Sequence, residues 1–322
     1  MSLTSTSLDP DEARRALALW DLPAPVTEVR PGSGTANASA IIRLGDELML
    51  LKRRNPRYAV ADWVAFDHAL MAHLGARGVP VPIPVPARDG GTWAGLDGGV
   101  YELFGFLPGD EHRPGDVGQV CAAGEMLARF PLASDGFEPP AEKAWERYHS
   151  PADIVAGLAT IRAAAGAVSA AEADAFAVAD RVAAELVTRL PDEVYWALPT
   201  TIVHGDWHPA NLKFDGGRVA GVFDLDWCTR QPRAVDLADG LLFFCSHRAK
   251  QIVPGDIWSL TQTMRMDAEL TRAFGAGYTA LLSPTGDELA ALADLMRCRW
   301  LYCRVDAAVR KVEVGRRVEF LL

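Results

Sequence analysis

The sequence predicts an α+β fold with two lobes, a small one built on an antiparallel sheet and a larger, mainly helical one. Three observations lead to this prediction. Short apolar stretches separated by turn signals dominate residues 1–108. Alanine-rich stretches with helical periodicity dominate residues 109–322. One polar stretch, residues 200–227, interrupts the helical part with two short apolar strands, and we call it the polar hairpin.

The composition is that of an ordinary globular protein, with 322 residues of which 49% are hydrophobic and 23% charged. The start of the sequence lacks a basic segment followed by an apolar core, and no apolar run is long enough to cross a bilayer. We therefore expect a cytoplasmic protein without a membrane partner. A net charge of −10 argues against nucleic acid as the main partner. The five cysteines lack CxxC or zinc-type spacing, which favours reduced thiols in a packed interior.

The small lobe is predicted to begin with a helix over residues 9–20. Asp9 is a capping residue, Pro10 suits the first helical position, and Glu12 follows three residues after the cap. The other elements predicted here are strands over 25–30, 40–44, 47–54, around 92–94 and over 100–104, and a helix over 61–78 that ends in glycine. Strands joined by short turns predict an antiparallel sheet.

The helical lobe is predicted to begin just after Pro108, where the apolar spacing changes to helical periodicity. Helices are predicted over 116–130, within 151–190 and from about 235 to the end. Only the polar hairpin interrupts them.

The polar hairpin reads TTIVHGDWHPANLKFDGGRVAGVFDLDW. Its first apolar strand is followed closely by Asp206, in a loop where reactive groups on a rigid scaffold are usually found. Asn211 lies five residues later, and Asp224 follows the second apolar run. A turn at residues 215–217 returns the chain, so we expect Asp224 to approach Asn211 and Asp206.

Two acids and an amide in this arrangement suit phosphoryl transfer. The protein must then neutralise developing charge with magnesium and orient the attacking hydroxyl. Asn211 and Asp224 supply hard oxygen ligands for magnesium. Asp206 stays available to accept the proton of the hydroxyl, a role in which position matters more than base strength.

The order H-x-D-x-x-x-x-N, followed by a strand and an aspartate, matches the catalytic and metal loops of the protein-kinase-like fold. HGDWHPAN with VFDLD resembles the aminoglycoside phosphotransferase and choline kinase group of small-molecule kinases. The likeness is greatest to the branch containing type II homoserine kinases and stress-response kinases. Gly205, where protein kinases have arginine, favours the small-molecule group. The resemblance implies ATP and Mg²⁺ as cofactors and a small-molecule hydroxyl as the phosphate acceptor.

The resemblance also implies supporting roles within and after the hairpin. His204 would hydrogen-bond its ring to backbone around the catalytic loop, and Asp236 would fix that loop through backbone hydrogen bonds. Asp226 would orient the loop or contact a second metal. His208 either faces the substrate or only belongs to the loop.

Lys52 is the candidate for the nucleotide phosphates, because it lies on a strand with two apolar faces and needs an anionic partner. Only five of the 32 basic residues are lysines, and none other precedes residue 143. The resemblance implies that Lys52 contacts the α and β phosphates and pairs with an acid on the next helix, for which Asp67 matches best. The alternative is an exposed cation beside Arg53 and Arg54.

Two further segments are candidates for nucleotide binding. Gly32, Ser33 and Gly34 lie in a loop between strands, where backbone N–H groups can cover phosphates, although such a tripeptide is often only a turn. The resemblance implies that the Glu102 carbonyl and the Phe104 amide contact adenine. An aromatic strand buried in a core is the alternative there.

Two other functions are compatible with the hairpin. A metal-dependent hydrolase could use the H-x-D-x-H set with a later aspartate to bind transition metals, but it would leave Lys52 and Asn211 without a role. Its ligands would be His204, Asp206, His208 and Asp224. A non-catalytic nucleotide-binding module is disfavoured because the acids and the amide are all present.

The acceptor is expected in the helical lobe, lined by parts of residues 140–195 and by helices after 236. Acidic loops near the catalytic position suit an amino-alcohol, an amino sugar or an aminoglycoside. A homoserine-like acceptor needs a cation, for which Arg297, Arg299 and Arg304 are equal candidates. The oligomeric state stays open.

Overall fold

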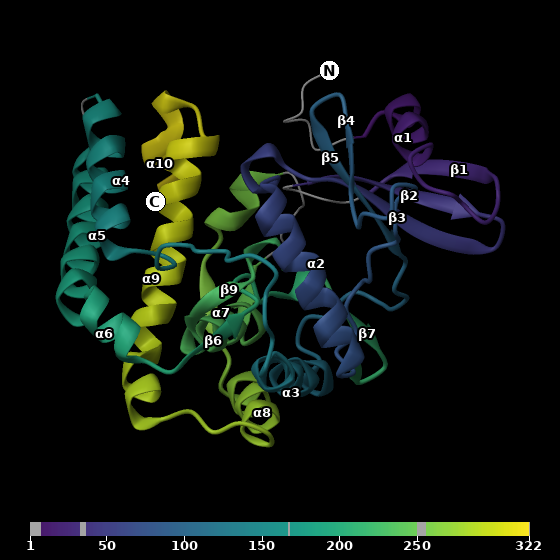
Figure 1. Cartoon of the computed structure of the whole chain (residues 1–322). Helices are drawn as coiled ribbons and strands as arrows, with labels where there is room; N and C mark the ends of the chain where they lie inside the picture. Colours follow the sequence, from purple (N-terminus) through teal and green to yellow (C-terminus); the bar gives the residue numbers. More distant parts are fainter. Residues whose placement is uncertain (1–7, 33–36, 167, 250–255, 322) are drawn as a thin grey trace.

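The computed structural model describes residues 8–32, 37–166, 168–249 and 256–321. A five-stranded antiparallel sheet with two helices forms one part, and the other part is mainly helical (Figure 1). The predicted α+β class with a sheet-rich and a helical part is therefore confirmed. The boundary at residue 108 stays a prediction.

The sheet has the strand order β1-β2-β3-β5-β4, with every neighbouring pair antiparallel. Its strands are β1 (Val26–Pro31), β2 (Ala38–Leu44), β3 (Glu47–Arg53), β4 (Ala94–Leu96) and β5 (Gly99–Gly105). Alternation along β2 buries Ala38, Ala40, Ile42 and Leu44. These residues form a core with Trp20 and α1 (Pro10–Leu17), which is capped by Asp9 as predicted.

Helix α2 (Ala61–Ala76) joins the two parts of the molecule. It follows a short 3₁₀ turn, η1 (Pro56–Tyr58). Its buried residues Phe66, Leu70 and Leu74 share one hydrophobic core with residues of the helical part such as Leu127 and Phe214. The packing of α2 therefore fixes the sheet against the helical part.

The other part of the molecule is mainly helical, and capping motifs in the sequence explain where several of its helices begin. The helices are α3 (Val117–Ala133), α4 (Pro151–Ala164), α5 (Ala170–Arg189), α6 (Asp192–Ala197), α7 (Ala234–Phe244), α8 (Ala268–Thr279), α9 (Gly286–Lys311) and α10 (Arg317–Leu321). Capping boxes start α5 at Ser169 with Glu172 and α9 at Thr285 with Glu288. Helix α9 packs against α4, α5 and α7, and its side facing α7 borders the polar hairpin region (Figure 1).

The polar hairpin forms two separate strand pairs. Strands β7 (Leu212–Asp215) and β8 (Arg218–Val222) pair around the predicted turn, so this hairpin is confirmed. The strand before the catalytic loop, β6 (Thr200–Val203), pairs instead with β9 (Thr229–Pro232), which the sequence pattern did not predict. Short 3₁₀ turns lie between them at η2 (Pro209–Asn211) and η3 (Leu225–Trp227).

One further strand pair contradicts the expectation of helices alone after residue 235. Strands β10 (Ser246–Arg248) and β11 (Met264–Met266) pair where only helices were predicted, because three-residue strands carry too few positions to show alternation. Turns η4 (Ile257–Thr261) and η5 (Val314–Arg316) complete the chain. Across the described ranges, none of the helices has the length and apolar character to cross a bilayer.

Candidate active site

The loop after β6 brings Asp206 and Asn211 together. The Asn211 side-chain amide donates to the Asp206 backbone carbonyl at 2.9 Å and to Asp206 Oδ2 at 3.3 Å. The Asn211 backbone N–H donates to the His208 carbonyl at 3.0 Å, which closes the η2 turn. Because Nδ2 faces Asp206, the amide oxygen of Asn211 points away from it and is the atom left for a cation.

Gly205 is required by the geometry of this loop. Its φ is +81°, a left-handed value that side chains disfavour, and an added Cβ would lie 2.8 Å from the Trp227 carbonyl oxygen. Its N–H donates to Asp236 Oδ1 at 2.8 Å, and the His204 N–H donates to Asp236 Oδ2 at 2.6 Å. Asp236 on α7 thus contacts the loop as predicted. Burial raises its pKa to about 6 in spite of both bonds.

The His204 ring is fully occupied by backbone groups, also as predicted. Its Nε2 donates to the Phe223 carbonyl at 2.8 Å, and its Nδ1 accepts from the Asp206 N–H at 3.3 Å. Burial lowers the pKa of His204 to about 4, so the ring is neutral near pH 7.

Asp224 lies just after β8 and beside Asn211. The Phe223 N–H donates to the Asn211 carbonyl at 2.9 Å, and Asp224 itself has a left-handed φ of 60°. Its side chain is 33% exposed. Partial burial and the carboxylate of Asp226 raise the pKa of Asp224 to about 6, although Lys52 opposes the shift. Negative charge is therefore in excess at this position.

Lys52 reaches the hairpin from β3. Its Nζ lies 2.6 Å from Asp226 Oδ1, 3.7 Å from Asp224 Oδ1 and 4.0 Å from Glu102 Oε2. The side chain is buried, which opposes its charge, but the three carboxylates outweigh this and raise the pKa of Lys52. The reading of Lys52 as a solvated edge cation is therefore wrong.

The predicted pairing of Lys52 with Asp67 is also wrong. Asp67 binds Arg54 Nη1 and Lys143 Nζ, each at 2.6 Å. Two features of the sheet explain the difference. Glu102 lies directly opposite Lys52 in the β3–β5 register, and Arg54, the first residue after β3, has the longer reach to α2.

Lys143 is a site residue that the sequence reasoning missed. Its Nζ donates to Asp67 Oδ1 and to the Asp226 backbone carbonyl, both at 2.6 Å, and its side chain is buried. It therefore ties α2 to the segment that carries Asp224. The rarity of lysine in the chain was the available signal, but it was applied only to Lys52.

The predicted adenine contacts of Glu102 and Phe104 are contradicted by the sheet. The Arg54 N–H donates to the Val100 carbonyl, and the Phe106 N–H donates to the Leu48 carbonyl. Every second residue from Val100 to Phe106 therefore forms its backbone hydrogen bonds with β3. Glu102 and Phe104 belong to this series, opposite Lys52 and Leu50, so their backbone N–H and carbonyl groups point toward β3. The Glu102 side chain is buried against Arg54 and His68.

The loop between β1 and β2 is described only in part. Gly32 packs so closely that an added Cβ would lie 2.1 Å from Ser39 Oγ, and its N–H donates to the Ser39 carbonyl. Ser33 and Gly34 lie outside the described residues. At the end of the loop, Asn37 donates to Asp226 Oδ2 at 2.8 Å, so this loop contacts the same carboxylate as Lys52.

Asp206 has a cationic neighbour that the sequence did not single out. Arg299 on α9 donates to Asp206 Oδ1 at 2.7 Å, and His208 Nε2 lies 3.2 Å from Oδ2. Burial favours the neutral carboxyl, but His208, Arg299 and His204 outweigh it and hold the pKa of Asp206 far below its usual range. Asp206 is therefore ionised at neutral pH.

The site fits a hard divalent cation better than a transition-metal cluster. The Asn211 amide oxygen and the Asp224 carboxylate are both oxygen ligands. Burial and the neighbouring Asp226 carboxylate raise the pKa of Asp224, and a bound cation would neutralise part of this negative charge. His204 could bind a metal only by losing its ring hydrogen bonds. Among the residues that the structure describes, no group of three or more His, Cys, Asp and Glu side chains is arranged to bind a metal.

Comparison with known proteins finds one family over most of the chain. A model of the phosphotransferase enzyme family matches residues 27–291. A homoserine kinase of Granulibacter bethesdensis is 30% identical over 288 residues, which cover 88% of this chain and 81% of the relative. A homoserine kinase of Rhizobium etli (strain CIAT 652) is 26% identical over 307 residues, covering 91% and 83%.

Solved structures with a similar fold are small-molecule phosphotransferases. A microcompartment-associated aminopropanol kinase has a TM-score of 0.71 at 18% identity, covering 97% of this chain and 94% of that one. An aminoglycoside phosphotransferase from Alicyclobacillus acidocaldarius also has a TM-score of 0.71, at 15% identity, covering 99% and 93%. An amicoumacin kinase solved with AMP-PNP and Ca²⁺ has a TM-score of 0.66 at 15% identity, covering 92% and 85%.

Proposed function

We propose that this chain, which belongs to the phosphotransferase enzyme family and is a small-molecule kinase, transfers the γ-phosphoryl group of ATP to a hydroxyl with the aid of Mg²⁺. One observation carries the proposal. Asp206, Asn211 and Asp224 converge on one loop system, and the Lys52 ammonium approaches it from the sheet, 3.7 Å from Asp224 Oδ1. Acid, amide and ammonium are the groups that phosphoryl transfer requires.

Asp206 is the residue we assign to the acceptor hydroxyl. Its side chain is 23% exposed, so a small alcohol can reach it. The hydroxyl oxygen attacks the γ-phosphorus, the bond from that phosphorus to the β–γ bridging oxygen breaks, and the hydroxyl proton passes to Asp206 as ADP leaves. An ionised carboxylate of low pKa is a weak base, but a loose transition state loses the proton late and depends mainly on position.

Asn211 and Asp224 are the residues we assign to the metal. A magnesium ion bound there would neutralise charge on the β and γ phosphates. The excess negative charge at Asp224 supports this assignment, because a cation would relieve it. Asp226 is already engaged by Lys52 and Asn37, so its role is to orient Lys52 and the β1–β2 loop.

Lys52 and the end of β5 are assigned to the nucleotide. An ammonium has three donors, so Lys52 can add a phosphate oxygen to its contact with Asp226. The hydrogen bond from the Phe106 N–H to the Leu48 carbonyl is the last one between this segment and β3. The Gly105 carbonyl, which faces away from β3, and the Leu107 amide are therefore our candidates for adenine in place of Glu102 and Phe104.

The acceptor class that we propose is a small alcohol. Homoserine kinases and an aminopropanol kinase are among the similar proteins, and both names describe a hydroxyl compound of a few carbons that also carries an amino group. The test is a coupled assay of ADP formation with Mg·ATP over amino-alcohols, sugars, aminoglycosides and water alone. Acceptor-dependent ADP formation supports the kinase. Release of phosphate from ATP or from phosphate esters at a rate that no acceptor changes would favour the hydrolase.

A further inference from the structure

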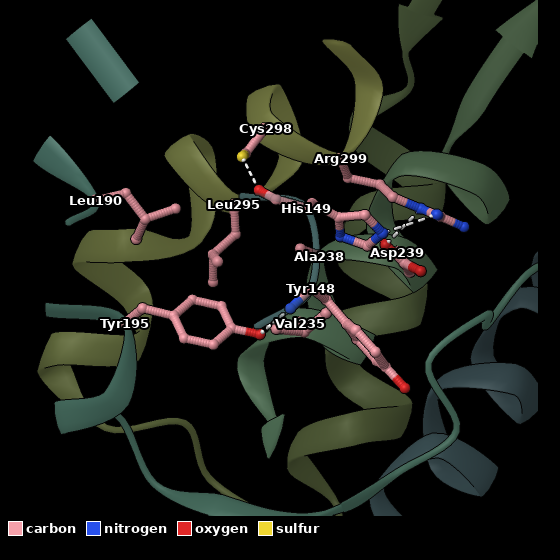
Figure 2. A pocket seen from close by; sticks show the side chains of 10 residues that line it. All are labelled: Tyr148, His149, Leu190, Tyr195, Val235, Ala238, Asp239, Leu295, Cys298 and Arg299. Atoms are coloured by element: carbon pink, nitrogen blue, oxygen red, sulfur yellow. Dashed lines mark hydrogen bonds and ion pairs between the residues drawn. The ribbon is translucent and has the colours of Figure 1, made fainter. Parts of the chain in front are cut away.

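Two arginines contact carboxylates at the two ends of the polar hairpin. Figure 2 shows Arg299 extending from α9 toward Asp239, at the edge of a small cavity. Its guanidinium also donates to Asp206, so Arg299 belongs to the acceptor side of the site. Arg54, the first residue after β3, reaches the other end of the hairpin at Asp226. Its side chain is fully buried on the nucleotide side, where the phosphoryl transfer described above assigns it no role.

Arg54 binds three buried carboxylates from three different elements. Its Nη1 donates to Asp67 Oδ2 on α2 at 2.6 Å. Its Nε and Nη2 form a fork on Glu102 of β5, with distances of 3.1 Å to Oε2 and 2.6 Å to Oε1. Nη2 also lies 3.3 Å from Asp226 Oδ1 in η3. One guanidinium can serve three carboxylates in this way because its five N–H groups point in fixed, different directions.

Lys52 and Arg54 share an oxygen atom on each of two carboxylates. The Lys52 Nζ lies 2.6 Å from Asp226 Oδ1 and 4.0 Å from Glu102 Oε2. Arg54 contacts the same two oxygens at 3.3 and 3.1 Å. The Lys52 side chain is 10% exposed and the Arg54 side chain 0%, so Lys52 is the cation of the two that a ligand can reach.

This overlap has a consequence when a nucleotide phosphate binds Lys52. Asp226 and Glu102 are almost completely buried, and a buried carboxylate that loses its cation is strongly destabilised. If Lys52 were their only cation, its ammonium could turn toward a phosphate only at that cost. Because Arg54 contacts the same two oxygens, both carboxylates keep a cationic partner when Lys52 shifts.

We propose that Arg54 is a positioning residue, which takes over Asp226 and Glu102 when the Lys52 ammonium binds the phosphates of a nucleoside di- or triphosphate. This inference rests on the proposed function, since it presumes that Lys52 meets those phosphates. Arg54 acts through Lys52 and does not itself contact the nucleotide. The alternative is a purely structural role, in which Arg54 only ties α2, β5 and η3 together.

The test measures how much the phosphates add to nucleotide binding. The quantity is the ratio of the Kd for adenosine to the Kd for ADP, from titration calorimetry at one fixed Mg²⁺ concentration. A substitution that only loosens the fold weakens both ligands on the same protein and leaves the ratio unchanged. Lys52→Met sets the scale, and its ratio should fall by about tenfold or more. If it keeps the wild-type ratio, Lys52 does not bind phosphate, and the nucleotide part of the proposed function fails together with the inference.

The variant of Arg54 is designed to keep the buried charges balanced. Arg54→Gln alone would leave three buried carboxylates with two cations, so it is combined with Glu102→Gln, which removes one anion as well. The reference is Glu102→Gln alone, which retains Arg54 and should have at least the wild-type ratio. In the double variant Asp226 keeps Lys52 but not Arg54, so the ratio should fall about tenfold below the reference.

Arg54→Lys decides the question if the double variant does not fold. One ammonium cannot contact three carboxylates as the planar fork does, so its ratio should lie at least about threefold below wild type. The matched control is Arg53→Gln, because Arg53 is a buried neighbour that binds Glu12 of α1 at 2.5 Å, and it should keep the wild-type ratio.

Three results would overturn the inference while Lys52→Met still lowers the ratio, and they would leave the kinase intact. The first is an equal ratio in the double variant and in Glu102→Gln. The second, where the double variant does not fold, is a wild-type ratio in Arg54→Lys. The third is an equal fall in Arg53→Gln, since the effect would then belong to any buried arginine of this strand region.

Discussion

Lys52 and Asp226, 174 residues apart in the chain, form a buried hydrogen bond of 2.6 Å between the sheet and the polar hairpin. Asp226 also accepts from Asn37, and its backbone carbonyl accepts from Lys143. One aspartate thus connects the strand that carries Lys52, the β1–β2 loop and the segment before α4. This arrangement places the Lys52 ammonium 3.7 Å from the carboxylate of Asp224, the assigned metal ligand.

Asp206→Asn tests the assigned proton acceptor. The amide retains the shape of the side chain but cannot take the hydroxyl proton, so kcat should fall by about 10²- to 10⁴-fold. Nucleotide affinity, measured by titration calorimetry with Mg·ATP, should stay nearly constant because Lys52, Asn211 and Asp224 are untouched. Unchanged turnover would remove Asp206 from the mechanism.

Asp224→Ala tests the assigned metal ligand. Loss of the carboxylate should weaken ATP binding in the presence of Mg²⁺ and abolish most of the stimulation by the metal. The measurement is ATP affinity over a range of Mg²⁺ concentrations. Asp215→Ala, an exposed aspartate at the turn of the same β7–β8 hairpin, is the matched control and should behave as wild type. A normal magnesium response in the Asp224 variant would contradict the assignment.

Lys143→Met tests the buried link between α2 and the hairpin. Removing the ammonium leaves Asp67 with one cationic partner fewer and the Asp226 carbonyl without this donor. Breaking a buried pair from one side should lower the free energy of unfolding by about 3–5 kcal/mol. Lys213→Met removes a partly exposed lysine 3.5 Å from Glu111 and should cost no more than about 1 kcal/mol. Equal losses in urea unfolding would show that Lys143 is not a structural link.

The pH dependence of stability should report the neutral His204 ring. Its pKa is about 4 in the folded protein and about 6.5 in the unfolded chain, so between these values protons bind preferentially to the unfolded state. Stability from this group is complete above pH 6.5 and is lost as pH falls to 4, by on the order of 3 kcal/mol. His204→Gln keeps a donor for the Phe223 carbonyl but does not titrate. As the pH falls from 6.5 to 4, the free energy of unfolding of the wild type should therefore decrease relative to that of this variant. A difference that stays constant over this range would contradict the buried neutral ring.

The sequence predicted the parts of the site that are local in the chain. Asp206, Asn211 and Asp224 lie within one hairpin, where strand and turn signals define the return of the chain, and Asp236 and His204 followed from the resemblance. Pairings across the molecule were not accessible. The partner of Lys52 depends on the register of β3 with β5 and on the reach of Arg54, which no periodicity encodes.

Lys143 was missed, and Arg299 was named only as one of three equal candidates, for different physical reasons. Lys143 lies in a segment without regular structure, so no pattern assigned it a direction. Arg299 is one of four arginines on α9, and only the packing of α9 against α7 turns it toward Asp206. The strands β9, β10 and β11 escaped prediction because three or four residues carry little alternation.

Transfer of label from [γ-³²P]ATP to a hydroxyl acceptor, compared between the wild-type protein and Asp206→Asn, tests the central claim most directly. We predict that, with Mg²⁺ present, the label appears on the acceptor in step with ADP and that the substitution reduces this rate by at least about 10²-fold. Label that appears only as inorganic phosphate, or transfer that proceeds equally in both proteins, would contradict the account.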